Sequence, residues 1–457
     1  MFGSARQRRR AIGCVAALAS ATAAGLIVGV APAHGASTRW IEQFGTAGND
    51  IVTAVASVTN GDVYVLGSTE TGVGNGAVVG GPSDLFLAKY DQYGTLRWVR
   101  QFGTEASESA ASTMAVSPNG DVYIAGSTTG AFTSVSNSGY PGTHDVFIMK
   151  FDRNGNQRWV RQYGTIGDDL ALGIARSSIG ELYISASTTG VFNSGTRPPN
   201  VAAGGVDALV LKTNVGGTLR WSYQFGTAGD DRASGITARG ISEVYVVGST
   251  EGDLDGVGSQ VHHLGRDAFI MRLNRLGRQL WLRQVGTDAD DEFRGVIHDP
   301  VSSVYAVGST TGVLGTVAGY NTQIGPSTSD AVVFRFGRTG TTTWANQFGT
   351  TGDDSATSVS LTWNGRVYVG GLTTGSITGA VAAGGTDQML ARLPSTGASV
   401  VARQFGTPGD DASTSSGTPV NAVRRGRVVF GGATANNLWG YANAGGTDAT
   451  ATVVSTW

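Results

Sequence analysis

Paired acidic residues recur in one short motif of this sequence, Gly-Thr-x-Gly-Asp-Asp and its variants. Such carboxylates could supply oxygen ligands to a hard cation such as Ca²⁺, or act as acid and base on a glycosidic bond. The interpretation that we favour is structural, because an Asp in a turn commonly accepts hydrogen bonds from nearby backbone N–H groups. The motif acids are Asp50, Glu108, Asp168, Asp169, Asp230, Asp231, Asp290, Asp291, Asp353, Asp354, Asp410 and Asp411.

A second acidic run, Asp253-Leu254-Asp255-Gly256, is typical of the start of a calcium-binding loop, although no downstream Glu completes the pattern. Asp253 and Asp255 are therefore the candidate metal ligands, and Ca²⁺ is the only cofactor that the sequence suggests. Leu254 also fits a recurring apolar position that would pack each such loop against its own sheet. The equivalent residues are Phe132, Phe192 and Leu314.

A basic residue stands five positions after a recurring Asp in six copies of a longer repeat. In the middle of a strand such a cation would be partly buried and would need polar partners, for which the repeat Gln and Asp residues are the candidates. We favour a structural polar network, and an anion site shared between copies is the alternative. The residues are Lys89, Lys150, Lys212, Arg272, Arg335 and Arg392.

Conventional catalytic motifs do not occur in the sequence, which has no Gly-x-Ser-x-Gly, His-Glu-x-x-His or Walker-type segment. We therefore expect no catalytic residue. The side chains that do not repeat are mostly aromatic and polar groups in loops, which suit recognition better than acid-base chemistry. The candidate ligand-binding residues are Tyr140, His144, Tyr320, Trp439 and Tyr441.

The elements that must position these residues belong to a repeat of 57 to 63 residues. The copies start near Trp40, Trp98, Trp159, Trp221, Trp281, Trp344 and Val401. Each contains four short segments, here called strands A to D, that are rich in β-branched or aromatic residues and bounded by Gly, Asp or Asn. The Trp of strand D and the Phe four residues later lie on one face, where we expect them to fill the space between neighbouring sheets.

Variation in length is concentrated in one connection of the repeat. The last Thr of strand B and the Asp that opens strand C are 14 to 20 residues apart, whereas that Asp and the next Trp position are always 14 apart. Insertions are tolerated where the backbone is not paired, so the B to C segment is a variable surface loop. Because the D to A turns lie at the same end of each sheet, we expect this face to be acidic.

The two ends of the repeat array complement each other. The last copy lacks strand D, and an extra strand D, Arg39 to Phe44, precedes the first complete set. Pairing of that strand with residues 448–454 would close the sheets into a ring without open edges. The sequence therefore predicts an all-β fold, a seven-bladed β-propeller of four-stranded blades over residues 37–457, closed by the N-terminal strand. An open β-solenoid is the alternative.

The order of motifs resembles the bacterial beta-propeller repeat family of the SBBP type. The matching motifs are Trp-x-x-Gln-Phe-Gly-Thr-x-Gly-Asp-Asp, then Val-Tyr-Val-x-Gly-Ser-Thr, then Gly-Gly-x-Asp-x-Phe-Leu-x-Lys-Tyr-Asp, and they recur over about residues 38 to 454. The resemblance implies a propeller in an exported or surface-associated bacterial protein, with no general catalytic role. Val401 for Trp, Val429 for Tyr and Glu108 in the acidic turn depart from the pattern.

The first 36 residues are interpreted as a secretory signal peptide. Arg6, Arg8, Arg9 and Arg10 precede an uncharged stretch that ends at Ala31-Pro32-Ala33, a sequence that signal peptidase accepts. An uncleaved membrane anchor is the alternative. Cleavage would remove Cys14, the only cysteine, and would leave 28 basic and 34 acidic residues, a net charge of about −6. We therefore expect no disulfide, no stable membrane span and no nucleic-acid partner in a secreted or cell-surface protein.

These observations favour an exported, non-catalytic scaffold that binds an extracellular protein or a polysaccharide through the variable loops. The alternative is a polysaccharide-directed hydrolase or lyase that uses an acidic cluster on the same face. A mechanical spacer in a surface assembly is a third option.

Overall fold

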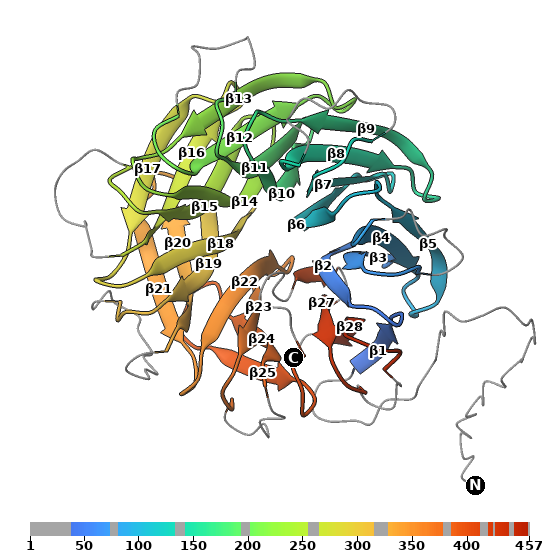
Figure 1. Ribbon diagram of the computed structural model, residues 1–457. Helices are drawn as coiled ribbons and strands as arrows, with labels where there is room; N and C mark the ends of the chain where they lie inside the picture. The colour runs from blue at the N-terminus through green and yellow to red at the C-terminus, as the bar shows by residue number, and fades with distance from the viewer. Residues whose placement is uncertain are drawn as a thin grey trace, which may run out of the picture.

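The computed structural model describes residues 38–73, 81–132, 142–192, 202–254, 265–314, 328–377, 385–411, 419–423, 426–437 and 443–455. In these ranges the chain forms seven four-stranded antiparallel sheets arranged as blades around a central axis (Figure 1). Each blade is a meander from the axis outwards, and the described residues contain no helix long and apolar enough to cross a membrane. The predicted seven-bladed propeller is confirmed.

The strands of the seven blades have the following bounds. Blade 1 contains β2 (Asp50–Ser57), β3 (Val63–Thr69), β4 (Asp84–Tyr90) and β5 (Leu96–Phe102). Blades 2 and 3 contain β6 (Glu108–Val116), β7 (Val122–Thr128), β8 (Asp145–Phe151), β9 (Gln157–Tyr163), β10 (Asp169–Arg176), β11 (Leu182–Thr188), β12 (Asp207–Thr213) and β13 (Leu219–Phe225). Blades 4 and 5 contain β14 (Asp231–Arg239), β15 (Glu243–Thr250), β16 (Asp267–Asn274), β17 (Gln279–Val285), β18 (Asp291–His298), β19 (Ser303–Thr310), β20 (Asp330–Gly337) and β21 (Thr342–Phe348). Blades 6 and 7 contain β22 (Asp354–Leu361), β23 (Val367–Thr373), β24 (Asp387–Leu393), β25 (Val401–Phe405), β26 (Val420–Val423), β27 (Arg427–Thr434), β28 (Asp448–Ser455) and β1 (Thr38–Phe44).

The ring is closed by pairing between the first and last described strands. β1 lies antiparallel to β28, with Trp40 opposite Val453 and Phe44 opposite Ala449. Figure 1 shows the blue β1 beside the red β28. This pairing supplies the fourth strand that the last copy lacks, so the predicted closure is confirmed and the outer edge of β28 is paired.

Neighbouring blades are held together by the repeat aromatic residues. The indole of Trp98 in blade 1 donates from Nε1 to the carbonyl of Arg153 in blade 2, at 3.3 Å. The same ring covers Gly155, where a Cβ would stand 2.9 Å from it. Phe102 packs on Phe151 of the next blade, with ring centroids 5.0 Å apart. The predicted place of these residues between blades is confirmed, and a side chain in place of Gly155 would push the blades apart.

The cations of strand C have partners that differ from those expected. Lys89 pairs with Asp62 at 3.0 Å, and Lys150 pairs with Asp121 at 2.8 Å. The acid stands directly before strand B, because antiparallel pairing of strands B and C brings that end of the blade beside the cation. The expectation that the repeat Gln and Asp residues take this role was therefore wrong. A structural polar network is nevertheless present in these blades.

Candidate functional site on the loop-bearing face

The loop-bearing face is the end of the propeller that carries the seven D to A turns and the feet of the B to C loops. The loops themselves fall mainly outside the described residues, which include their first and last few positions. Each foot stands on the buried ends of strands B, C and D, so the chemistry of those ends determines what the loops are mounted on.

A Gln from strand D fastens each described loop foot. In blade 5, Gln347 Nε2 donates to the carbonyl of Gly312 at 2.9 Å and to Asp330 Oδ2 at 2.8 Å. Its Oε1 accepts the backbone N–H of Leu314 at 3.0 Å. One amide thereby satisfies both the entering backbone and the carboxylate that opens strand C, which explains why Gln recurs at this position. The Gln residues that donate to the Asp of strand C in this way are Gln43, Gln101, Gln162, Gln224, Gln284, Gln347 and Gln404.

We call this set of hydrogen bonds from the strand-D Gln the Gln clamp. The apolar residue beside it packs the loop foot onto the blade. Phe132, Phe192 and Leu314 are all buried, and Leu254 packs against the core of blade 4. This confirms the predicted packing role of the recurring apolar position. Because both ends of each B to C loop are fixed in this way, the number of residues can vary only in the segment between them.

The second acid of each D to A turn is buried and serves the turn itself. Asp354 is 1% exposed, and its Oδ2 accepts the backbone N–H of Thr350 at 2.5 Å and the hydroxyl of the same residue at 2.8 Å. The favoured capping interpretation is therefore confirmed. The residues that accept the equivalent backbone bond are Asp50, Glu108, Asp169, Asp231, Asp291, Asp354 and Asp411.

The first acid of the turn lies at the surface and caps a different segment. Asp353 Oδ1 accepts the backbone N–H of Ser329 at 2.9 Å, just before strand C. His144 makes the same backbone bond to Asp168, and its Nδ1 also lies 2.9 Å from that carboxylate. Only this first member of each pair reaches solvent, so the motif contributes less negative charge to the loop-bearing face than the sequence led us to expect.

Two carboxyl groups meet beside the glycine that directly precedes the Thr of most D to A turns. A Cβ on Gly349 would clash with Asp330 Oδ1 and would stand 2.7 Å from Asp354 Oδ2. Burial raises the pKa of Asp330 to about 6, with the hydrogen bond from Gln347 opposing this and the Asp354 carboxylate adding to it. Burial likewise raises the pKa of Asp169 to about 6 in blade 3. Desolvation and mutual repulsion both favour the protonated form.

Most of the predicted ligand-binding residues are not among those described. Tyr140, Tyr320, Trp439 and Tyr441 lie outside the described residues, as does the candidate metal ligand Asp255. The described members of the predicted sets are His144, paired with Asp168, and Asp253, at the foot of its loop. Among the described residues no group of three or more His, Cys, Asp or Glu is arranged to hold a metal ion.

The axial channel contains unrepeated charged residues that the sequence analysis did not single out. Glu292 and Arg294 on β18 form an ion pair of 2.5 Å, and Ser309 donates to the same carboxylate at 3.3 Å. Glu292 and Arg294 line a cavity of about 440 Å³ at the loop-bearing end of the channel. Among the inner strands only β18 carries an acid and a base at these two positions, so a comparison of the inner strands alone could have revealed the pair.

The acids of this face are therefore arranged for structure more than for catalysis. A general acid and base must both be free to reach a substrate. The capping carboxylates instead accept two or more hydrogen bonds from their own turns, and burial separates them from solvent. The loop-bearing face consists of loop ends that are held in place by hydrogen bonds and that surround the axial channel.

Part of the chain is similar in sequence to a curated protein. It is 32% identical over 208 residues to the regulatory protein FlaEY of Caulobacter vibrioides, which covers 42% of this chain and 21% of that protein. The chain thus spans about a fifth of the length of this relative.

Solved structures resemble this chain only weakly and at low sequence identity. A PL25 ulvan lyase is 11% identical with a TM-score of 0.45, covering 91% of this chain and 96% of that one. Sqt1 of Chaetomium thermophilum is 13% identical with a TM-score of 0.41, covering 93% and 100%. Likeness at this level carries no argument about function. In the sequence comparison, residues 97–132 match the SBBP beta-propeller repeat, so the chain contains a repeat of this type.

Proposed function

We propose that this protein is an exported, non-catalytic scaffold that binds an extracellular protein or a polysaccharide through its B to C loops. The observation that carries the proposal is the Gln clamp, which holds each described loop foot by backbone hydrogen bonds while leaving the length of the loop free. Binding surfaces in many folds are built in this way, from variable loops on a rigid frame.

The alternative, a hydrolase or lyase, would need accessible carboxylates on the same face. The buried position of Asp354 and its equivalents supports the binding role, because these groups already accept the hydrogen bonds of their turns. Incubation of the protein with a panel of acidic and neutral polysaccharides, followed by reducing-end and unsaturated-product assays, separates the two. Product formation that depends on a loop-face acid would overturn the proposal.

The binding proposal itself is tested with arrays of bacterial surface polysaccharides and envelope proteins. We expect specific binding to one class, and exchange of the B to C loops with those of a related propeller should change the partner. A ring that binds nothing in either array, or that keeps its partner after the exchange, would contradict the proposal. Export is tested separately, by fractionation of cells that express the full chain with a C-terminal tag.

A further inference from the structure

The turn face, opposite the loop-bearing face, breaks the repeat symmetry in its charges. This face carries the A to B and C to D turns. In blades 1 to 3 each strand-C cation has one acidic partner, as in the Lys212–Glu181 pair at 2.8 Å. These pairs are electrically balanced, so this part of the turn face carries little net charge from the repeat residues.

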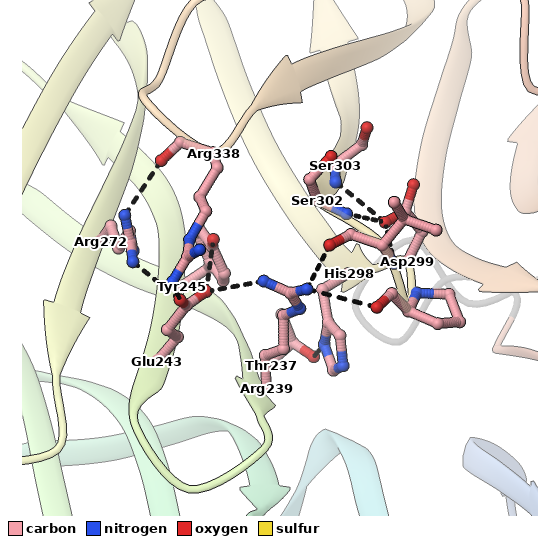
Figure 2. Close-up of polar contacts among 12 residues, drawn as sticks. Thr237, Arg239, Glu243, Tyr245, Arg272, His298, Asp299, Ser302, Ser303 and Arg338 are labelled. Atoms are coloured by element: carbon pink, nitrogen blue, oxygen red, sulfur yellow. Dashed lines mark hydrogen bonds and ion pairs between the residues drawn. The ribbon is translucent and has the colours of Figure 1, made fainter.

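Blade 4 surrounds one carboxylate with three guanidinium groups (Figure 2). The Glu243 carboxylate accepts hydrogen bonds from the guanidinium groups of Arg272, at 2.8 Å, and Arg239, at 3.1 Å. It also pairs with Arg338 from the next blade. The Glu243 side chain is 5% exposed, whereas that of Arg338 is 56% exposed. These cations help to keep the pKa of Glu243 below its ordinary value, against burial, which raises it. The cluster therefore carries two more positive charges than negative ones, and Arg338 presents one of them to solvent.

Blades 5 and 6 keep the cation of strand C but replace the acid before strand B. Ser303 stands at the acid position beside Arg335, and Arg366 stands at the acid position beside Arg392. Arg335 Nε is buried and has no hydrogen-bond partner among the described atoms, and its guanidinium lies over the Tyr305 ring. The substitution of Ser and Arg for Asp or Glu makes successive blades more positive.

The only carboxylate on the described A to B and C to D turns of blades 5 to 7 is that of Asp299. Its Oδ1 accepts the backbone N–H groups of Val301, Ser302 and Ser303 at 2.7 to 2.9 Å, as Figure 2 shows in part. It therefore caps its own turn, and it supplies the one carboxylate charge that these described turns set against the arginines Arg335, Arg338 and Arg366. Arg239 also donates to the carbonyls of Pro300 and Val301, which fixes this turn against blade 4.

The mouth of the axial channel lies inside this arc. A cavity of about 620 Å³ opens there, and its ionisable lining residues are Arg176, Arg294, which pairs with Glu292, and His298. Trp363, 83% exposed, and Val301, 77% exposed, stand on neighbouring turns. An exposed aromatic ring beside guanidinium groups can pack on the apolar face of a ring-shaped ligand while the cations bind its charges.

We propose that this basic crescent, Arg239, Arg272, Arg335, Arg338 and Arg366, binds an acidic polysaccharide. Cations spread over three successive blades suit a chain of regularly spaced carboxylates or sulfates, which guanidinium groups bind with paired hydrogen bonds. Nucleic acid fits less well, because the whole chain carries a net charge of −2 and a pI of about 6.2, whereas nucleic-acid binding domains are usually strongly basic. The proposal concerns a second surface and does not depend on the loop-mediated function.

The chain offers a matched pair of variants for the test. Arg338 and Arg153 occupy the same position of the C to D turn in blades 5 and 2, and the carbonyl of each accepts the indole N–H of a repeat Trp. Both side chains are exposed, but in the described residues only Arg338 belongs to a cluster with surplus positive charge. Arg338→Glu and Arg153→Glu therefore change net charge equally while differing in their proximity to the crescent.

Binding is measured by interferometry with immobilised mature protein and four probes: alginate, heparin, neutral dextran and single-stranded DNA. We expect alginate or heparin to bind, with affinity falling as NaCl rises, and dextran not to bind. Arg338→Glu should weaken binding by about tenfold or more, and Arg153→Glu by less than about twofold. Arg338→Gln removes the positive charge without placing a second carboxylate beside Glu243, so it is less prone to disturb the fold. It should also weaken binding.

Three results would overturn the inference. These are no binding of either acidic polysaccharide, an equal loss with Arg153→Glu, or tighter binding of DNA than of both polysaccharides. A ring with shortened B to C loops should keep its affinity for alginate or heparin, so failure of the loop-mediated function and failure of the crescent are distinguished.

Discussion

Asp330 and Asp354 lie together under Gly349, one at the start of strand C and the other at the start of the next inner strand. Both side chains are 1% exposed, and Asp330 Oδ1 is buried without a hydrogen-bond partner. The arrangement recurs around the ring, so the same glycine position brings two carboxyl groups together in successive blades. A structural motif that depends on buried, paired acids should respond to charge and to pH.

Asp330→Asn should stabilise the protein at neutral pH. An Asn side chain can still accept the hydrogen bond of Gln347 through its oxygen, and it removes the repulsion from Asp354. The rise in the pKa of Asp330 from 3.8 to about 6 means that keeping this carboxylate ionised in the folded protein costs about 2 to 3 kcal/mol. We expect Asp330→Asn to recover part of this free energy. Chemical unfolding at pH 7 measures the change. Asp330→Ala, which leaves the Gln347 amide unpaired, is the destabilising control, and a loss of stability in Asp330→Asn would refute the explanation.

Mild acidification should raise the melting temperature of the unmodified protein. Asp169 and Asp330 have raised pKa values in the folded state, so the folded protein binds their protons more tightly than the unfolded chain does. The cost of burying these two groups as carboxylates therefore disappears as the pH falls through about 6, and the free energy of unfolding rises. Asp299 and Glu243 have lowered pKa values, and their contribution is lost as the pH falls below about 4. Scanning calorimetry should therefore find maximal stability between about pH 4 and 6. A melting temperature that rises steadily up to pH 8 would contradict this.

Gly349→Ala should destabilise the fold strongly. The added Cβ would meet two buried carboxyl groups that cannot move without losing their hydrogen bonds, and overpacking of this kind costs about 1 to 3 kcal/mol. Gly337→Ala is the matched control, because the nearest atom to its Cβ would be the Thr341 carbonyl at 3.7 Å. Thermal unfolding of both variants compares them directly. Equal effects would mean that the carboxyl pair is not tightly packed.

Gln347→Leu should loosen the foot of the loop in blade 5. The substitution leaves the Leu314 N–H, the Gly312 carbonyl and Asp330 without their shared partner, at a cost of about 3 kcal/mol or more. Hydrogen exchange should accelerate at Leu314 more than in the strands of the opposite side of the ring. Thr343→Ala, at an exposed position of the same strand, should change neither quantity. Unchanged protection at Leu314 in Gln347→Leu would show that the clamp is dispensable.

Removal of divalent cations should leave the melting temperature unchanged. The carboxylates of the D to A turns accept hydrogen bonds from backbone N–H groups, which stabilise the turns without a metal ion. Thermal scans with EDTA and with millimolar Ca²⁺ check this. A rise with Ca²⁺ that disappears in an Asp253→Asn, Asp255→Asn double variant would assign these two residues as calcium ligands, the role that the sequence pattern suggests for them.

The fold could be predicted closely because it depends on features that repeat. Strand B of blade 1, Val63–Thr69, and strand C, Asp84–Tyr90, end at the predicted residues, and the Trp and Phe positions lie between blades as expected. Alternation along a strand and a fixed repeat length determine these properties locally.

The charged clusters could not be predicted in the same way, because their members come from different strands and blades. Lys89 meets Asp62 only through the register of strands B and C, which places Tyr64 opposite Lys89. Arg338 reaches Glu243 across a blade boundary. A repeat pattern emphasises what the copies share, and the departures from it carry the chemistry that differs from blade to blade.

The most direct test of the account compares the full ring with one in which all seven B to C loops are shortened to a common length between the Gln-clamped feet. The measured quantity is the affinity for the protein or polysaccharide that the arrays identify, with the melting temperature as a control for folding. The account predicts a closed, cooperatively melting ring that has lost this binding. Undiminished affinity in the shortened ring would show that the loops are not the binding surface.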